Sequence, residues 1–503
     1  MFGRFVWRRV GPGGFGVWAV LAFFVGAEVF GPAFGQTASR RRAIERLLDR
    51  VSGDGGGLMP RSVPGVTGEE LLFVEGGLAL SFGALSVDEE DETTEFVQAV
   101  ARPSFRVGYA GVHELVGRLS LDFRKYEEGD DDTALSRSGR LSKPIVEELW
   151  YRLDFGEGVD RGWWGEGVLG SLALTVGRRD TAIGTGLVLD RSLVVGEVEA
   201  SVGFAEVRLF GGVTPSDSTI DFDASRPGFD SSVHRWFVGG EVWFDAGGGV
   251  RPFVYGLAQI DANTEDEAVV DVGGVPTLTE FGYDSRYVGG GFEATVGERW
   301  VVSAEGVYEF GESVSNPFDY GTGLAIDPTR DEISAWAGTA TVTRLFRDAG
   351  RSSVVAQVVV GSGDEDRISS NQTVGGNASG TTDRAFNGFG VVPLGFVLAP
   401  EPSNLVVGRV AGRTGVDVGL SRMVEIGVDG YVYGKLNSEA GTSFATVEGE
   451  RFVGVGFDAF VSWPLRHDVR VDVQYGVFVP GEAIPEGDDG LRDLVYVGVT
   501  YVF

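Results

Sequence analysis

From Glu69 to the last residue, apolar and polar side chains alternate along the chain. The C-terminal segment is the clearest case, because one face carries Val495, Val497, Val499, Tyr501 and Phe503 and the other carries Tyr496, Gly498 and Thr500. Successive side chains of a β-strand point to opposite faces, so this period of two predicts a strand with one apolar face. The same alternation recurs over 469–477 and 149–155.

The alternating segments predict eighteen strands, each boundary being uncertain by about two to four residues. They cover 71–87, 94–108, 113–126, 146–156, 169–179, 193–202, 204–214, 233–244, 251–262, 285–296, 299–312, 333–346, 352–363, 404–416, 423–437, 451–463, 466–479 and 493–503. A further apolar stretch, 389–398, is not counted, because single-chain bacterial barrels favour an even number of strands. Residues 364–403 therefore form one long loop in this interpretation.

Loop lengths predict how such a barrel is oriented. Short turns at 202–203, 297–298 and 464–465 alternate with long polar stretches at 127–145, 215–232, 263–284, 313–332, 364–403 and 438–450. In bacterial outer-membrane barrels the short turns face the periplasm and the long loops face outward. The aromatic residues that end strands at the short turns are then expected to form a girdle at the inner lipid interface: Phe244, Trp300, Phe346, Trp463 and Phe503.

The first 35 residues have the pattern of a secretory signal peptide. Arg4, Arg8 and Arg9 precede an apolar run over 17–30, and residues 33–35 end in an Ala-Phe-Gly cleavage pattern. A transmembrane anchor is the alternative, but the run is short and contains Glu28, whereas a span needs about 20 apolar residues. We therefore expect a signal peptide over 1–35, a periplasmic N-terminal segment and linker over 36–68, and a barrel over 69–503.

The alternation by itself also suits a soluble β-sandwich or β-solenoid, since a sandwich also buries one face and wets the other. The export signal and the aromatic C-terminal residue favour the membrane. The predicted fold class is thus all-β, an antiparallel transmembrane β-barrel of about 18 strands in the bacterial outer membrane, with outer-membrane lipids as its partners.

Composition agrees with this class. The chain has 79 glycines, 34 phenylalanines and no cysteine, which removes disulfides and thiolate chemistry. Loss of the signal peptide takes away three arginines and one glutamate and leaves 39 basic and 72 acidic side chains, a formal charge of −33. A chain this acidic is not expected to bind nucleic acid.

Several segments resemble the alginate export family of outer-membrane porins. The likeness is carried by 148–155, 174–180, 184–190, 204–212, 286–312 and 404–409. The resemblance implies an eighteen-stranded barrel whose arginine- and lysine-lined lumen passes a polyanionic polysaccharide. A terminal phenylalanine that closes a strand also resembles the assembly signal of outer-membrane proteins, which implies recognition of Phe503 by the assembly machinery.

The face opposite the apolar residues gives the predicted pore lining. Its bases are Arg118, Arg124, Arg152, Arg208, Arg235, Arg409, Arg413, Lys435 and Arg470. Its acids are Asp122, Asp154, Glu197, Glu199, Glu206, Glu241, Glu293, Glu305, Glu309, Glu425, Asp429, Asp458 and Asp472. Acids outnumber bases, which departs from the family pattern and would repel an alginate-like polymer. We therefore keep the pore and not the polyanionic substrate.

These charges have two interpretations. Opposed arginines and carboxylates can form a selectivity lining, or they can pair across neighbouring strands and only stiffen the wall. For a single residue the second interpretation is favoured; Arg152 with Asp154, and Arg208 with Glu206, are pairs that could neutralise each other. Arg409 and Arg413 share a strand face without an intervening acid, which makes them the best candidates for an exposed basic contact.

Enzymatic function is disfavoured by the histidines. His113 and His467 fall at periplasmic turns and His234 on an apolar face, so none is placed as a base beside an external nucleophile. No phosphate loop, dinucleotide fingerprint or histidine metal motif is present. The acid-rich stretches 88–92, 127–132 and 363–366 lack the ligand spacing of a calcium loop and are interpreted as solvated loops. No cofactor or metal is therefore expected.

Eighteen strands enclose a wide bore, since eight suffice only for a packed interior. The functional hypothesis is a porin that gives passive passage to hydrophilic solutes or a polysaccharide. The alternative is a structural or adhesive barrel whose lumen is plugged, for which the loop over 364–403 is the candidate plug.

Overall fold

The computed structural model describes residues 72–89, 92–128, 140–141, 143–163, 172–217, 220–231, 233–263, 267–272, 275–419 and 423–503. The predicted signal peptide and the segment 36–68 lie outside these residues, as does much of the acid-rich stretch 127–132, and they stay predictions. Among the described residues, no helix has the length and apolarity needed to cross a bilayer.

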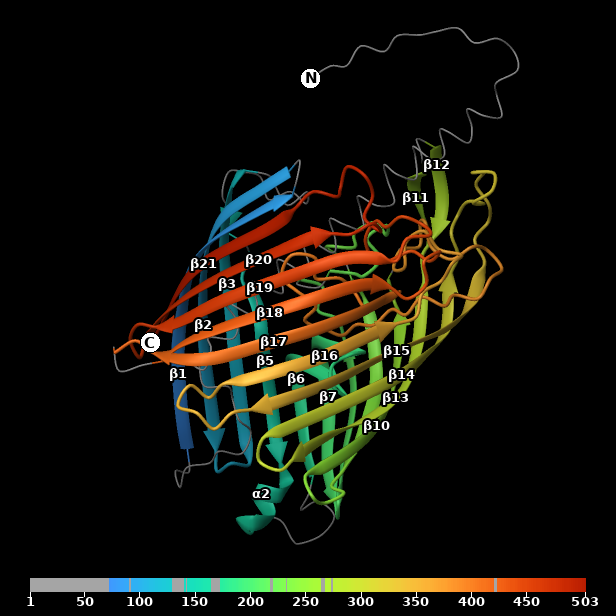
Figure 1. The fold of residues 1–503 in the computed structure, drawn as a ribbon. Helices are drawn as coiled ribbons and strands as arrows, with labels where there is room; N and C mark the ends of the chain where they lie inside the picture. Colours follow the sequence, from blue (N-terminus) through green and yellow to red (C-terminus); the bar gives the residue numbers. More distant parts are fainter. Residues whose placement is uncertain are drawn as a thin grey trace, which may run out of the picture.

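Eighteen strands form one antiparallel sheet that closes on itself (Figure 1). They are β1 (Leu72–Glu89), β2 (Glu92–Tyr109), β3 (His113–Glu128), β5 (Ile145–Asp154), β6 (Leu172–Ile183), β7 (Leu189–Val202), β8 (Ala205–Val213), β9 (Arg235–Phe244), β10 (Val250–Asp261), β13 (Tyr283–Val296), β14 (Trp300–Val314), β15 (Arg330–Leu345), β16 (Ser353–Gly361), β17 (Leu405–Asp417), β18 (Met423–Lys435), β19 (Phe452–Pro464), β20 (Val469–Pro480) and β21 (Arg492–Val502).

The first and last strands close the barrel. β1 pairs with β21 from Ala79 opposite Val502 to Glu89 opposite Arg492. The backbones of Leu78 and Phe503 extend this seam, with N···O distances of 2.8 and 3.1 Å. Closure leaves no unpaired sheet edge, which is the condition for a β-structure to reside in hydrocarbon.

All eighteen predicted strands are confirmed, and each boundary lies within four residues of its predicted position. The apolar stretch 389–398 is not a strand and belongs to the 362–404 connection between β16 and β17, as expected. Three short elements were not predicted: β4 (Arg140–Leu141), the hairpin of β11 (Glu267–Val272) and β12 (Val275–Glu280), and α2 (Phe155–Asp160). Residues 263–284, expected to be a loop, thus contain the β11–β12 hairpin. The alternating pattern is also interrupted by one short helix, α2.

Burial confirms which face of each strand is outside. In β21 the side chains of Val495, Val497, Val499 and Tyr501 are exposed, whereas Tyr496 is only 4% exposed. Apolar side chains therefore point away from the barrel and polar ones into it, the reverse of a soluble sandwich. Such an outward apolar belt is stable only against lipid, so the chain is an outer-membrane barrel.

Most connections alternate in length around the barrel as predicted, with two exceptions: β1 and β2 are joined by only two residues, and the β5–β6 connection at the opposite rim spans 155–171. The C-terminus, α2 and the short turns 203–204, 297–299 and 465–468 lie at one rim, and the long connections, including the β11–β12 hairpin, lie at the other (Figure 1). The predicted girdle residues all belong to the short-turn rim, where Trp300, Phe346 and Phe503 are exposed and Phe244 packs against Phe204.

Some of the glycines leave room for aromatic rings that lie flat on the inner wall. Gly427 of β18 is paired with Phe460 of β19, and a Cβ at Gly427 would lie 2.0 Å from the Phe460 ring. The guanidinium of Arg413 stacks on the same ring, 5.2 Å from its centre. A larger residue at Gly427 would displace both side chains.

The lipid-facing assignment makes Val428, an outward residue in the middle of β18, a sensitive position. We expect Val428→Arg to lower the free energy of unfolding in vesicles by about 2–4 kcal/mol, the cost of a cation near the bilayer midplane. The measurement is a denaturant titration followed by heat-modifiable gel mobility. Val447→Arg, in the 436–451 connection outside the strands, is the matched control and should change little; equal effects would contradict the assignment.

Candidate pore and its constriction

The 362–404 connection between β16 and β17 folds into the barrel and contacts wall strands around its whole circumference. Phe389 forms a bridge with Leu189 at the start of β7, and the hydroxyl of Tyr433 on β18 donates to the carbonyl of Leu394 at 2.8 Å. Phe396 packs among residues of β1, β2, β3 and β21. One segment that contacts strands on all these sides must cross the lumen.

The crossing segment is apolar, and it divides the interior into buried clusters. Phe386 and Phe389 belong to a cluster with residues of β7, β9, β10, β13 and β14. Leu394 and Leu398 belong to a second cluster with residues of β16 to β20. The half of the barrel nearer the long connections is therefore filled by packed side chains, and residues 386–398 cross and narrow the lumen there.

The turn between β6 and β7 also bends inward. Its Gly184 amide donates to Glu241 on β9 at 2.9 Å, and its Thr185 amide donates to Glu305 on β14 at 2.7 Å. Gly184 has a φ of +58°, and a Cβ there would lie 2.8 Å from the Glu305 carboxyl. Glycine is needed at this position both for the left-handed backbone and for the close approach to the wall.

The described residues 220–231 of the β8–β9 connection pack on the crossing segment from the side of the long connections. Its Phe222 ring contacts Tyr283 and Phe389, with centroids 5.0 and 5.5 Å apart. Its Asp221 accepts hydrogen bonds from the Arg235 guanidinium at 3.0 to 3.3 Å and pairs with Arg226 at 3.2 Å. This ion pair fixes the loop to β9.

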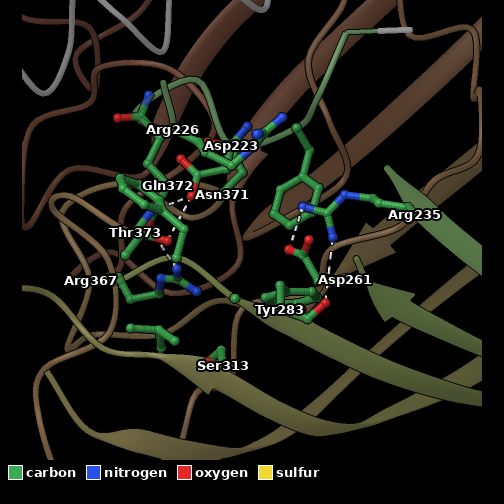
Figure 2. Close-up of a pocket in the computed structure, with 14 residues that line it drawn as sticks. Asp223, Arg226, Arg235, Asp261, Tyr283, Ser313, Arg367, Asn371, Gln372 and Thr373 are labelled. Carbon is green, nitrogen blue, oxygen red and sulfur yellow. Dashed lines mark hydrogen bonds and ion pairs between the residues drawn. The ribbon is translucent and has the colours of Figure 1, made fainter. Parts of the chain in front are cut away.

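Figure 2 shows the contact between these two inward loops. Arg235 faces Asp261 and Tyr283 on one side of a cavity of about 10 Å³, and Asp223, Thr373 and Arg367 lie on the other. Asp223 accepts hydrogen bonds from the Thr373 hydroxyl at 2.6 Å and from its amide at 3.2 Å. Both loops are therefore held to each other as well as to the wall.

The two aspartates of this loop have opposite electrostatics. Burial by itself raises the pKa of Asp221, but Arg235 and Arg226 outweigh it and hold the pKa below its usual range. Burial raises the pKa of Asp223, which hydroxyl and amide hydrogen bonds only partly offset. Asp221 is thus the charged anchor of the loop.

All fifteen residues predicted to line a pore have side chains on the inner face of their strands, and most of them are paired. Arg118 contacts Glu147 and Glu148, Arg124 contacts Asp122, Arg152 contacts Glu199 and Asp154, and Arg470 contacts Asp472. The Lys435 amine donates to the carbonyls of Ser438 and Val447. That they line a pathway stays a prediction.

Two expectations about individual bases are wrong. Arg208 does not pair with Glu206; it contacts Glu241 at 2.9 Å, and Glu206 pairs with Arg251 at 2.5 Å. Arg208 and Glu241 lie opposite each other in the β8–β9 register, whereas the Glu206–Arg251 pair spans β9 and joins β8 to β10.

Arg409 is not an open basic contact either. Its guanidinium binds Asp429 of β18 at 2.8 Å and lies over the Tyr431 ring. The acid comes from the neighbouring strand, which a pattern read within one strand does not reveal.

Sequence reasoning missed further inner bases. Arg102 pairs with Glu147, Arg106 pairs with Glu114, and Arg251 pairs with Glu206. The same alternation could have found Arg102 and Arg106, because they are in phase with buried Phe96 and Val100 and out of phase with exposed Val97 and Phe105.

A second, larger cavity lies toward the short-turn rim. Its volume is about 620 Å³, and it is bounded by α2 and strands β5 to β10 and β13. Its charged lining consists of Arg152, Arg208, Arg251, Asp154, Glu199, Glu206, Glu241 and Glu293. Five carboxyls face three guanidiniums, so the cavity is acidic. We call it the vestibule.

His113 and His467 lie at the short-turn rim, as expected, whereas His234 precedes its strand instead of lying on the strand's apolar face. His113 begins β3 and its Nδ1 is 2.6 Å from the Tyr151 hydroxyl, and His467 is in the β19–β20 turn near Asp468. His234 precedes β9, and its amide donates to Asn263. Asp364, from the acid-rich stretch 363–366, is buried and accepts the amides of Asp366 and Arg384, so its carboxyl serves the loop backbone.

The chain matches no protein-family model and no curated protein sequence. Three solved outer-membrane porins share its fold with a TM-score of 0.50 each. They are Pseudomonas aeruginosa OccK11 (OpdR), with 9% identity over 86% of this chain and 96% of that one; Acinetobacter baumannii OccAB1, with 10% identity over 88% and 99%; and Pseudomonas aeruginosa OccK8 (OprE), with 11% identity over 86% and 98%.

The fold is that of outer-membrane porins. At this identity the likeness reports the architecture alone. These structural neighbours are themselves porins and not enzymes. None of these comparisons points to alginate export.

The porin-like barrel has an inward β8–β9 loop whose docking depends on Asp221. We expect Asp221→Asn to weaken docking by about 1.5–3 kcal/mol, because it removes the charged acceptor that Arg226 and Arg235 share, while Arg235 keeps Asp261 at 3.1 Å. Hydrogen exchange of residues 220–231 would measure this.

The pH dependence of loop docking provides a control for the effect of Asp221→Asn. A lowered pKa means that Asp221 stabilises docking above its unfolded pKa of about 3.9 and loses this effect as pH falls below it. The Asp221→Asn variant should lack that loss. Asp223→Asn keeps a neutral acceptor and should exchange nearly as the parent does; if both variants behave alike, Asp221 is not the anchor.

Proposed function

We propose that this barrel is a passive channel for hydrophilic solutes across the outer membrane, with residues 386–398 as its constriction. The observation that carries the proposal is the crossing of the lumen by this segment above an acidic vestibule of about 620 Å³. A cavity of that size holds a small polar molecule, and its charged walls offer hydrogen-bonding partners to replace water.

Small solutes fit this geometry better than a polymer does. The constriction contacts the wall on several sides, and a polysaccharide chain would have to displace it. The resemblance to alginate exporters rests on sequence segments, some of which have structural roles in this chain: 184–190 forms the inward turn, and Arg208 and Arg409 are paired in the wall. A saccharide polymer remains the second candidate substrate. Separately, Phe503 remains the proposed contact of the outer-membrane assembly machinery.

The acidic vestibule favours cations. Its three guanidiniums are each paired with a carboxyl, at 2.5 Å for Arg152 with Glu199, 2.9 Å for Arg208 with Glu241 and 2.5 Å for Arg251 with Glu206. Glu293 has no ion pair among the described residues and adds negative potential. Like charge repels anions from such a confined space, so neutral and cationic solutes are the expected substrates.

A plugged structural barrel is the competing function, and the packed half of the barrel nearer the long connections favours it. Planar-bilayer recording of the conductance distinguishes the two functions, because a plugged barrel gives no steady open-channel current.

The proposal predicts size- and charge-dependent uptake. Liposomes that contain the purified barrel should swell in neutral monosaccharides, more slowly in acidic sugars of similar size, and least in oligosaccharides. The series contradicts the proposal if swelling equals that of empty liposomes for every sugar.

Arg413 is the inner base whose replacement should change selectivity without loss of a pair, because it stacks on Phe460 and has no ion pair among the described residues. Arg413→Glu should shift the reversal potential in a salt gradient further toward cations. Arg409→Glu is the contrasting variant: it places a second carboxyl beside Asp429 and should mainly destabilise the wall. An unchanged potential in Arg413→Glu would assign Arg413 to the wall.

A further inference from the structure

Strand β14 presents three polar side chains to the lumen at a spacing of four residues, and each contacts an inward segment. Glu305 binds the β6–β7 turn, Glu309 binds the crossing segment, and Ser313 donates to Asp383 of the same connection at 2.9 Å. Residues i, i+4 and i+8 of a strand share one face, and each is about 13 Å from the next. The three contacts therefore follow one line along the wall.

Glu309 is the central contact. One carboxyl oxygen accepts the hydroxyls of Tyr283 at 2.6 Å and Tyr287 at 3.0 Å, and the other accepts the Asn387 amide at 2.9 Å. The Tyr287 hydroxyl also lies 2.5 Å from the Asn387 carbonyl. Glu309 is fully buried, so its removal would leave the Tyr283 hydroxyl and the Asn387 amide without this acceptor, while Tyr287 keeps the Asn387 carbonyl.

Glu305 makes the equivalent contact four residues earlier on β14, nearer the vestibule. One oxygen accepts the Tyr255 hydroxyl at 2.6 Å, and the other accepts both the amide and the hydroxyl of Thr185. No ion pair to Glu305 or Glu309 occurs within the described part of the chain. Both carboxyls therefore differ from wall acids such as Glu241 and Asp429, which bind arginines.

The two inward segments are joined to each other. The Phe389 amide donates to the Val188 carbonyl at 2.7 Å, and the Asp190 amide donates to the Phe389 carbonyl at 3.2 Å. A Cβ at Gly390 would lie 2.0 Å from the Gly186 carbonyl oxygen, so the two backbones are in direct contact. Wall, turn and crossing segment thus form one closed set of hydrogen bonds.

We propose that Glu305 and Glu309 are the positioning residues of the constriction: they hold the turn and the crossing segment against β14 and thereby set the size of the aperture. The inference rests on the proposed function, because an aperture has meaning only in a channel. The barrel wall does not need these carboxyls, since β14 is held by continuous backbone pairing with β13 and β15. Their loss should free the constriction and leave the barrel closed.

The test uses the full-length barrel in detergent and in bilayers, with Glu309→Ala, Glu305→Ala and the double variant. Single-channel conductance should rise in each single variant, rise further in the double variant, and become noisier. Glu309→Gln keeps an acceptor oxygen and should lie between the parent and Glu309→Ala. Glu425→Ala is the matched control, because Glu425 is an exposed inner carboxyl of β18 without a described loop contact.

Trypsin cleavage after Arg384 gives a readout that does not need a channel. Arg384 is exposed on the 362–404 connection, and cleavage of a held loop follows the population of its released form. Loss of Glu309 should speed cleavage by about tenfold or more, the factor expected when buried donors lose their acceptor. The Glu425→Ala control should be cleaved at the parent rate.

The outcomes separate the two proposals. If conductance and cleavage in Glu309→Ala and in the double variant equal those of Glu425→Ala, the positioning role is wrong. If no protein conducts but cleavage after Arg384 accelerates, the anchoring is supported and the channel function fails. Heat-modifiable mobility identifies any variant whose barrel has not formed; the Glu309→Gln variant then carries the test, and parental behaviour in it contradicts the inference.

Discussion

Hydrocarbon offers no hydrogen-bonding partner to a peptide group, so every amide and carbonyl at membrane depth must be satisfied within the chain. In this protein the pairing of β1 with β21 meets that condition for the sheet as a whole. With the wall closed and its apolar side chains turned outward, all remaining polar chemistry is confined to the interior. The position of each inner charge and each loop follows from that confinement.

The interior must also satisfy the backbone hydrogen bonds of the loops that enter it. Loops that enter the lumen bring backbone amides with them, and buried amides need acceptors. Wall carboxyls supply these acceptors: Glu241 for Gly184, Glu309 for Asn387 and Asp458 for Phe396. The excess of inner acids over inner bases is therefore partly structural. In the vestibule, Glu293 and Asp154 add acidic groups beyond the three closest ion pairs.

The likeness to solved porins and the geometry of the lumen contribute different information. The architecture is shared with proteins that are 9–11% identical, so it reports how a closed sheet is built and not what passes through it. The proposed channel function rests on features of this chain itself, above all on the crossing segment and on the paired charges of the vestibule.

The sequence by itself determined the wall. A period of two, an even strand count and alternating loop lengths were enough to place eighteen strands and their inner faces, because each strand's environment is set by its own alternation. The long 362–404 connection was also recognised, together with its possible role as a plug or constriction. The direction in which it folds depended on contacts with Glu309, Leu189 and Asp458, which are far away in the chain. Likewise, the Arg409–Asp429 and Arg208–Glu241 pairs join separate strands, and their partners follow from cross-strand register, which only the folded sheet fixes.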